Sequence, residues 1–314
     1  MKQYVFGIDV GGTSIKCGLF KADGTVVEKW EITTRTDEQG SHILRDVADG
    51  ILTALTEFNI RKEEVIGIGI GVPGPVKADG TVLVAVNLGW GFKDIIGELK
   101  EYTGLDVKAG NDANVAALGE MWQGGGQGFD DMIMVTLGTG VGCGVIVNGR
   151  IVIGAHGAAG EIGHARVDLQ EQEQCNCGNR GCLEQQASAT GIVKVAKEEL
   201  ASSTKESLLR DNEISAKIIF DAYKVQDELA ITIVKRFGAV LGNALAICST
   251  VVDPGVIVIG GGVSKAGSVL IDVLKEYFDR DAFPACREAD IVLAQLGNDA
   301  GIYGAAKLII DEQK

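Results

Sequence analysis

Three cysteines lie within eight residues in the stretch "QCNCGNRGCLE", residues 174–184. These are Cys175, Cys177 and Cys182, and the other four cysteines lie far apart in the chain. His164, one of only 3 histidines, precedes the cluster in "GEIGH". Three thiolates and one imidazole form a ligand set for tetrahedral zinc, and four protein ligands would make that zinc structural. A disulfide or a redox pair remains an alternative, although the spacing lacks the C-x-x-C of thioredoxin-like sites.

Three glycine-rich stretches each follow a predicted strand and could bind a nucleotide through backbone N–H groups. "DVGGTSIK" (9–16) adds two hydroxyl donors, but it is not a P-loop because no helix beginning Lys-Ser/Thr follows it. "LGTG" (137–140) offers the same groups, and "GGG" (260–262) leaves bare backbone for an adenine or a ribose. Each stretch alone is weak evidence, since glycine in a hairpin is usually only a turn. Together they predict a nucleotide held between two phosphate loops.

Asp112, in "GNDAN", ends a predicted strand and precedes a predicted helix. The carboxyl ends of strands are where α/β enzymes place their chemistry. An aspartate there can accept the proton of an attacking hydroxyl, as phosphoryl transfer to an alcohol requires. The alternative is a helix N-cap, which Asp also favours. The spacing alone does not decide between these two roles.

Two distant segments share one pattern of strand, glycine turn, strand and hairpin turn. They are "YVFGIDVGGTSIKCGLFKADG" at the N-terminus and "MIMVTLGTGVGCGVIVNGR" at 132–150, and they match to within a residue of register. This repeat predicts two related halves, each opening with a β-hairpin; chance resemblance of glycine-rich hairpins is the alternative. Apolar runs and periodicities predict further strands at 25–33, 65–72, 105–112 and 256–260, and helices at about 41–58, 92–104, 113–122, 188–201, 214–222, 226–251 and 300–310.

Length and charge limit the classes of function. A chain of 314 residues suggests about two domains of ~150 residues each. The net charge of −14, without clustered Lys and Arg, argues against nucleic acid as a partner. Asp9 interrupts the first apolar run before a signal peptide is complete, and no apolar run approaches the ~18 residues that span a bilayer. We therefore expect no membrane partner and a cytoplasmic location, where reduced thiols weaken the disulfide alternative.

The chain resembles the ROK family (repressor, open reading frame, kinase), and within it the ATP-dependent glucokinases. The motifs that carry the resemblance follow the family's order over nearly the whole chain: "GIDVGGTSIK", "GIGIGVPGPV", "NLGW", "NDANVAALGE", "TLGTGVGCGV", "GEIGH", "CNCGNRGCLE" and "VIGGGVS". The resemblance implies an α/β, actin-like (RNase H-like) two-domain kinase fold, with a duplicated β-hairpin phosphate-loop unit and a central cleft. It implies a small N-terminal domain at 1–115, on which a C-terminal helix at 301–314 packs. A larger domain at 116–300 would carry the zinc site.

The resemblance also implies roles for single residues. Asp112 would be the catalytic base, and His164 would bind Zn²⁺ with the three cysteines while its second nitrogen faces the sugar. The sugar hydroxyls would be bound by Asn87, Asn111, Asp112, Glu161, His164 and Glu184. ATP and Mg²⁺ would be bound by Asp9, Gly11, Gly12, Thr13, Lys16, Gly138, Thr139, Gly140, Gly261 and Gly262, with Asp9 holding Mg²⁺ through water. One departure is Cys143, which stands where a glycine is expected.

The implied activity is ATP-dependent phosphorylation of glucose at its 6-hydroxyl, in a homodimer or a homotetramer. ATP is favoured as the donor because the polyphosphate-using members lack the cysteine cluster. The family's repressors carry an N-terminal helix-turn-helix, for which a first strand beginning by about residue 4 leaves no room. The alternatives are a kinase for N-acetylmannosamine, N-acetylglucosamine, fructose or allose, and a sugar sensor without turnover. An intact Asp112 and two phosphate loops argue against the sensor.

Overall fold

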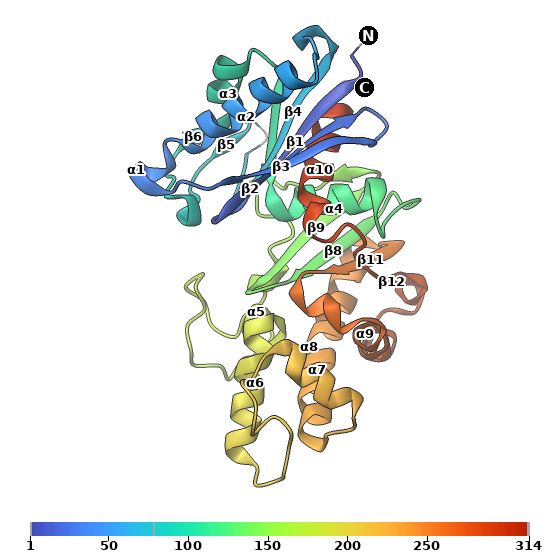
Figure 1. The fold of residues 1–314 in the computed structure, drawn as a ribbon. Helices are drawn as coiled ribbons and strands as arrows, with labels where there is room; N and C mark the ends of the chain where they lie inside the picture. The colour runs from blue at the N-terminus through green and yellow to red at the C-terminus, as the bar shows by residue number, and fades with distance from the viewer. Residues whose placement is uncertain (1, 78, 313–314) are drawn as a thin grey trace. The chain divides into compact units, whose positions relative to one another are not determined.

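The computed structural model describes residues 2–77 and 79–312, and the chain divides into two compact units (Figure 1). The first unit comprises Met1–Gly128, Arg150–Ala159 and Gln295–Lys314. The second comprises Phe129–Gly149 and Gly160–Ala294. The domain limits of 1–115 and 116–300 stay a prediction, because compactness alone does not define a folding domain.

A five-stranded sheet in the order β3-β2-β1-β4-β7 forms the centre of the first unit. β1, β2 and β3 are antiparallel, whereas β4 and β7 run parallel to β1. The strands are β1 (Tyr4–Val10), β2 (Ser14–Lys21), β3 (Val26–Thr33), β4 (Val65–Val72) and β7 (Val107–Asn111), with the short strands β5 (Thr81–Val82) and β6 (Lys93–Asp94) paired separately. The helices are α1 (Asp37–Gly40), α2 (Ile43–Glu57), α3 (Ile95–Thr103), α4 (Asp112–Gln123) and α10 (Ala300–Asp311), with short 3₁₀ turns η1 (Lys62–Glu64), η2 (Val86–Leu88) and η6 (Gly297–Asp299).

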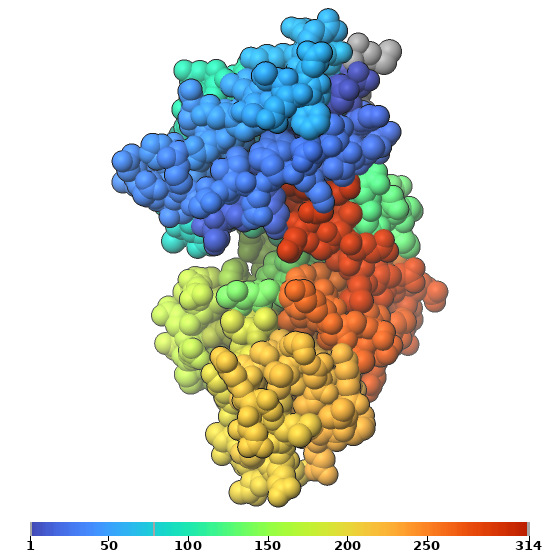
Figure 2. All heavy atoms as spheres, in the orientation of Figure 1, coloured from blue at the N-terminus to red at the C-terminus, as the bar shows by residue number. Residues whose placement is uncertain are grey.

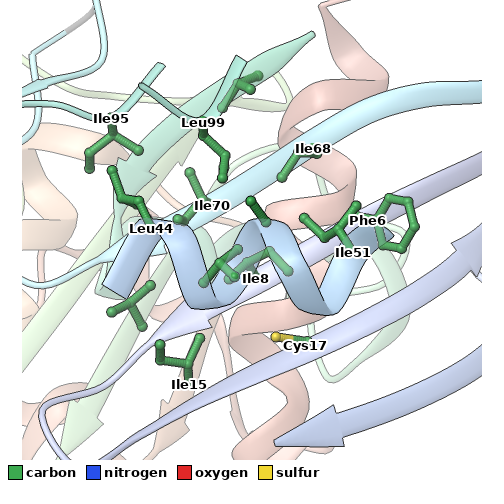
Figure 3. Packing of buried hydrophobic residues seen from close by; sticks show 14 of the residues in the cluster. Phe6, Ile8, Ile15, Cys17, Leu44, Ile51, Ile68, Ile70, Ile95 and Leu99 are labelled. Atoms are coloured by element: carbon green, nitrogen blue, oxygen red, sulfur yellow. The ribbon is translucent and has the colours of Figure 1, made fainter. Parts of the chain in front are cut away.

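The alternation of Ile and Gly in β4 reflects two different layers on the two faces of the sheet. Ile68 and Ile70 point toward α2 and α3 and belong to the main core of this unit (Figure 3). On the other face the backbone of α10 touches the sheet. A Cβ on Gly69 would lie 1.6 Å from the carbonyl oxygen of Ala305, so only glycine fits there. The buried parallel strand predicted at 65–72 is thereby confirmed, and Gly69 is explained by the close helix.

Helix α10 brings the end of the chain back onto its beginning. It packs against β1, β4 and α4, and Figure 2 shows the red C-terminal residues against the blue N-terminal strands. The contact with α4 is also made by glycines: a Cβ on Gly304 would lie 1.6 Å from the Val115 carbonyl oxygen, and one on Gly119 would lie 2.2 Å from that of Ala300. The helices α4 and α10 therefore meet backbone to backbone.

The second unit repeats the strand arrangement of the first. Its five-stranded sheet runs β10-β9-β8-β11-β12, in which β10 is Arg150–Ile151. β8 and β9 are antiparallel, and β11 and β12 run parallel to β8, as β1, β2, β4 and β7 do in the first unit. This common order confirms the predicted duplication. The strands are β8 (Met132–Leu137), β9 (Val141–Val147), β11 (Val256–Gly260) and β12 (Asp290–Leu293). β12 was not among the predicted strands, because four residues are too short for an alternation to be recognised.

Five helices accompany this second sheet: α5 (Glu184–Ala187), α6 (Ala189–Ser202), α7 (Ala216–Lys224), α8 (Glu228–Val252) and α9 (Ser268–Asp281), with 3₁₀ turns η3 (Ile162–His164), η4 (Gly262–Ala266) and η5 (Pro284–Glu288). By length and composition alone α8 could cross a membrane, contrary to the expectation from the sequence. Half of its apolar window is buried inside the unit, and it packs against α6, α7 and α9. A core helix of a globular protein has the same composition, so this is weak evidence for a span.

Candidate functional site

The end of β7 carries the predicted catalytic aspartate. Asn111 is the N-cap of α4, and its side-chain oxygen accepts hydrogen bonds from the N–H groups of Ala113 (3.0 Å) and Asn114 (3.2 Å). Asp112 is the first residue of the helix, and its Oδ1 accepts from the Ala113 N–H and the Asn111 Nδ2. The N-cap, which was the alternative role for Asp112, therefore belongs to Asn111. The Asp112 carboxylate is oriented by two donors at a helix N-terminus, where negative charge is favoured.

Asp9 lies at the end of β1, within electrostatic reach of Asp112. Burial, and next the Asp112 charge, raise the pKa of Asp9 to about 6, against an opposing effect of Lys16. Lys16 is the cross-strand partner of Asp9 on β2, and its Nζ donates to the Asn298 carbonyl oxygen at 3.2 Å. Two neighbouring carboxylates, of which one is partly buried, favour a cation between or near them.

The turn between β1 and β2 is braced by two hydrogen bonds from Thr34, which lies outside the hairpin. The hydroxyl of Thr34 donates to the Gly11 carbonyl oxygen at 2.7 Å, and the Thr34 N–H donates to the Thr13 carbonyl oxygen at 3.0 Å. Gly12 and Thr13 are exposed at the tip of this turn. A Cβ on Gly12 would lie 3.6 Å from Asn87. A predicted phosphate contact and a predicted sugar contact are therefore neighbours in this unit.

The turn between β8 and β9 is braced by the N-terminus of α6. The Ala189 N–H donates to the Gly138 carbonyl oxygen at 2.8 Å, and the Thr190 hydroxyl donates to that of Thr139 at 2.6 Å. Both carbonyl oxygens are thereby used within the protein, and the Gly138 N–H donates to the Gly140 carbonyl oxygen at 3.0 Å, so an anion at this turn would be bound by its other N–H groups. Gly140 lies against Glu184, because a Cβ there would be 2.5 Å from the Glu184 Oε2.

His164, Cys175, Cys177 and Cys182 are brought together in the second unit. One ligand atom from each lies within 4.8 Å of all the others. The Sγ atoms of Cys177 and Cys182 are 3.6 Å apart, and the Cys175 Sγ is 3.7 Å from the His164 Nδ1. Tetrahedral bonds of about 2.3 Å would place neighbouring sulfurs roughly 3.8 Å apart, whereas a disulfide needs about 2.05 Å. All three cysteines are free thiols, and their spacing fits a shared metal ion.

The thiols need a cation to be charged together. Burial, and next the neighbouring Glu184 carboxylate, raise the pKa of the Cys175 thiol.

Backbone geometry fixes the loop that carries the cysteines: the Cys175 N–H donates to the Asn179 carbonyl oxygen at 2.8 Å. Gly181 has φ +72°, and a Cβ on it would lie 1.8 Å from the Asp168 carbonyl oxygen. The glycine is therefore required by both its conformation and its neighbour.

The two ring nitrogens of His164 face different groups. Nδ1 lies on the side of Cys175 and is 3.5 Å from the Glu184 Oε1, while Nε2 lies 3.9 Å from the Glu161 Oε2. Glu184 Oε1 also accepts a hydrogen bond from the Cys175 Sγ at 3.0 Å. The two predicted sugar-binding glutamates thus flank the histidine, with Glu184 on the thiol side and Glu161 on the opposite side.

In the glycine turn after β11, packing explains why one residue must be glycine. Gly261 has φ +82°, and a Cβ on it would lie 2.5 Å from the Leu137 backbone nitrogen. Glycine is therefore needed there for packing against β8, whether or not a ligand binds. A Cβ on Gly262 would meet nothing within 4 Å, so the backbone of Gly262 is accessible to a ligand.

The sequence profile of the ROK family matches residues 5–312. The chain belongs to the ROK family. It is 41% identical to a glucokinase of Halalkalibacterium halodurans over 99% of this chain and 96% of the relative, and 36% identical to a glucokinase of Thermotoga maritima over 98% of both. Among solved structures, a ROK family glucokinase from Streptomyces griseus in complex with glucose and AMPPNP superposes with a TM-score of 0.75 at 33% identity, covering 97% of this chain and 98% of that one.

Membership of the ROK family confirms the predicted actin-like α/β fold, since the solved relatives superpose over nearly the whole chain. The structure places the predicted site residues of this ROK chain in two groups. The first unit holds Asp9, Gly11, Gly12, Thr13, Lys16, Asn87, Asn111 and Asp112. The second unit holds Gly138, Thr139, Gly140, Glu161, His164, Cys175, Cys177, Cys182, Glu184, Gly261 and Gly262.

Sequence reasoning missed the residues that brace these groups. Thr34 and Thr190 support the two turns through long-range hydrogen bonds that no local motif announces. Glu120 could have been noticed, because it is a charged residue in the otherwise apolar helix segment "NVAALGEMW". It is fully buried in the structure.

Proposed function

We propose that this chain is an ATP-dependent glucokinase, which transfers the γ-phosphoryl group of ATP to the 6-hydroxyl of glucose. The observation that carries the proposal is the carboxylate pair Asp9 and Asp112 beside the glycine turn of β1 and β2. The identity to glucokinases over nearly the full chain supports the same conclusion. The placement of Asn87 next to Gly12 supports a sugar bound beside the phosphate loop.

In the proposed reaction Asp112 is the general base. Its carboxylate accepts the proton of the 6-hydroxyl while that oxygen forms a bond to the γ-phosphorus and the bond from the γ-phosphorus to the β,γ-bridging oxygen breaks, releasing ADP. Asn111 holds Asp112 in place through its Nδ2, which donates to the Asp112 Oδ1 at 3.0 Å. The reaction needs little covalent chemistry from the protein, so positioning and charge stabilisation provide most of the rate.

We propose that both glycine turns bind phosphate through backbone N–H groups. In the first unit these belong to Gly12 and Thr13, with Lys16 near them, while the Gly11 N–H donates to the Ser14 carbonyl oxygen and shapes the turn. In the second unit they belong to Thr139 and Gly140, while the Gly138 N–H donates to the Gly140 carbonyl oxygen. The partly buried carboxylate of Asp9 fits a water-bound Mg²⁺, because a cation offsets the charges of Asp9 and Asp112. When bound, Mg²⁺ would neutralise charge on the phosphate oxygens. Gly261 and Gly262 are proposed to lie near the adenosine.

We further propose that His164 and the three cysteines bind one structural Zn²⁺. The donor set and the spacing of its atoms fit the metal. In this proposal His164 binds the metal through Nδ1 and presents Nε2 to a sugar hydroxyl, with Glu161 and Glu184 as acceptors on either side. Metal analysis of the purified protein should find about one zinc per chain.

The experiment that tests the function is an ADP-release assay with Mg²⁺, ATP and a panel of sugars. The panel includes glucose, 2-deoxyglucose, fructose, mannose, N-acetylglucosamine and N-acetylmannosamine. Glucose should have the highest kcat/KM, because a missing or displaced hydroxyl leaves a carboxylate acceptor of Glu161 or Glu184 unpaired. A higher kcat/KM for an N-acetylhexosamine would show that this sugar, not glucose, is the preferred substrate, while the proposed kinase activity would stand. Sugar binding without ADP release would indicate a sensor.

The predicted homodimer or homotetramer stays a proposal. Ile247 and Val251, one turn apart on α8, are 59% and 84% exposed. Large exposed aliphatic residues of this kind are typical of a surface covered in an assembly. Light scattering on the purified protein gives the mass directly, and a mass of one chain would contradict the proposal.

A further inference from the structure

Glu120 is the one charged side chain that is fully buried among residues 2–77 and 79–312. It lies on α4 and is not among the residues proposed to bind phosphate, sugar or metal. A buried carboxylate is costly unless hydrogen bonds satisfy its oxygens. Its three hydrogen bonds therefore indicate what the residue is for.

All three donors are backbone N–H groups. Glu120 Oε2 accepts from Gly125 at 2.8 Å and from Gln295 at 3.0 Å, and Oε1 accepts from Leu296 at 2.8 Å. Gln295 and Leu296 are the first residues of the segment that returns to this unit and continues into α10. Each carboxylate oxygen thus binds one N–H at the start of that segment and fixes it to α4.

The segment after Leu296 supports the charged end of the site. The Asn298 carbonyl oxygen accepts from the Lys16 Nζ at 3.2 Å, and Asp299 pairs with Lys29 at 2.7 Å. In the first turn of α10, Gly301 lies against the Asp9 carboxylate, since a Cβ there would be 2.4 Å from the Asp9 Cγ. Moving this segment would therefore move the surroundings of both Asp9 and Lys16.

The contacts of α4 and α10 fix the helix after the segment that Glu120 binds. A Cβ on Gly304 would meet the Val115 carbonyl oxygen, and the rings of Trp122 on α4 and Tyr303 on α10 have their centroids 6.3 Å apart. Asp112 directly follows β7, so the ladder of β1, β4 and β7 places it relative to Asp9. The hydrogen bonds of Glu120 act on the residues just before α10, which surround Asp9 and Lys16 from the other end of the chain.

We propose that Glu120 is a positioning residue that holds the segment 295–301 in place, and through it the alignment of Asp9 and Lys16 with the base Asp112. The proposal rests on the proposed kinase function, for which the alignment matters. Displacements of about 1 Å at a reacting centre cost up to ~10²-fold in rate. We therefore expect the loss of Glu120 to affect kcat rather than glucose binding.

The test is Glu120→Gln, which keeps the shape of the side chain. Whichever way the amide turns, at least one of the three N–H groups loses its acceptor. We expect kcat to fall roughly 10- to 100-fold, while the calorimetric Kd for glucose changes less than about threefold. Amide hydrogens in peptides covering residues 295–299 should exchange faster in the variant than in the wild type.

The matched control is Leu99→Ala on α3, a buried core change on the other face of the sheet from α10. It should lower the melting temperature at least as much as Glu120→Gln, yet leave kcat within about threefold at a temperature where both are folded. Equal kcat values for the two variants, or unchanged exchange at 295–299 in Glu120→Gln, would overturn the proposal. The exchange measurement needs no turnover, and the wild-type sugar panel tests the kinase function separately.

Discussion

The two β-hairpins that open the two units have the same topology but different chemistry. In the first hairpin, the second residue pair from the turn is Asp9 opposite Lys16, both charged. In the second hairpin the corresponding pair is Thr136 opposite Gly142, neither of which carries a charge. The next pair along contains a cysteine in both: Cys17 opposite Ile8 and Cys143 opposite Val135. The duplication has thus kept the buried positions and changed the polar ones.

The difference indicates a division of work between the two turns. The first turn lies beside carboxylates and a lysine. These groups can bind a cation and interact with the reacting phosphate. The second turn offers N–H groups and one hydroxyl, and its carbonyl oxygens are occupied by Ala189 and Thr190 of α6. A neutral turn of this kind can hold phosphate oxygens without taking part in the chemistry. Substitutions in the first unit should therefore affect turnover most.

Asp112→Asn should have the largest effect. The amide keeps the shape of the side chain but cannot accept the proton of the 6-hydroxyl, and loss of a general base costs ~10²–10⁴-fold in kcat. The glucose Kd, measured by calorimetry, should stay close to that of the wild type. A kcat near the wild-type value would remove Asp112 from the proposed mechanism.

Asp9→Asn and Thr136→Val form a pair at equivalent positions of the two hairpins. Asp9→Asn should lower kcat by ~10²–10³-fold, as removal of one electrostatic partner of the transition state does. It should also raise the Mg²⁺ concentration needed for half-maximal activity. Thr136→Val should change both quantities less than about fivefold, because it removes no charge that could stabilise the transition state. Similar losses in the two variants would contradict the division of work.

Much of this arrangement could be predicted from sequence, for reasons that differ from residue to residue. Local spacing suffices for the cysteine cluster, since Cys175, Cys177 and Cys182 are close in the chain and close in space. The duplicated hairpins are visible because each is a continuous segment. The two roles of Asp112 could not be separated, because an N-cap at residue 111 or 112 differs by one residue, and helix ends are the least certain part of a prediction.

The supporting residues could not be predicted because their partners are remote in sequence. Glu120 binds N–H groups of Gln295 and Leu296, and Thr190 binds the Thr139 carbonyl oxygen. The strand at 65–72 was predicted from its apolar residues, but the reason for Gly69 is the α10 backbone, which packs on the sheet from the far end of the chain. Contacts of this range follow from the tertiary fold and leave no periodic signal.

A smaller effect is expected from the proposed metal site, the cluster of His164 and three cysteines in the second unit. Cys177→Ala should raise the KM for glucose by roughly 10-fold or more, because loss of a ligand disturbs His164 and the adjacent Glu184. The KM for ATP should change little, and the melting temperature and the zinc content should fall. The matched control is Cys248→Ala on α8, which removes a thiol outside the cluster. Full zinc content together with unchanged kinetics in Cys177→Ala would contradict the metal site.

The smallest effects are expected where the two hairpins are alike. Cys17 and Cys143 are both buried, and Cys143 stands where the family resemblance led us to expect glycine. Burial raises the pKa of both thiols; Asp9 adds to the effect at Cys17, and Cys248 and then Glu161 add to it at Cys143. Both should therefore react slowly with iodoacetamide in the folded protein, because the thiolate is the reactive form.

Cys17→Ala and Cys143→Ala should each lower the free energy of unfolding in urea by about 1 kcal/mol, the scale of a small buried deletion. Neither should change kcat more than about twofold, since neither thiol is proposed to touch a substrate. If Cys143→Ala alone lowered kcat strongly, the second hairpin would contribute more to turnover than its neutral turn implies.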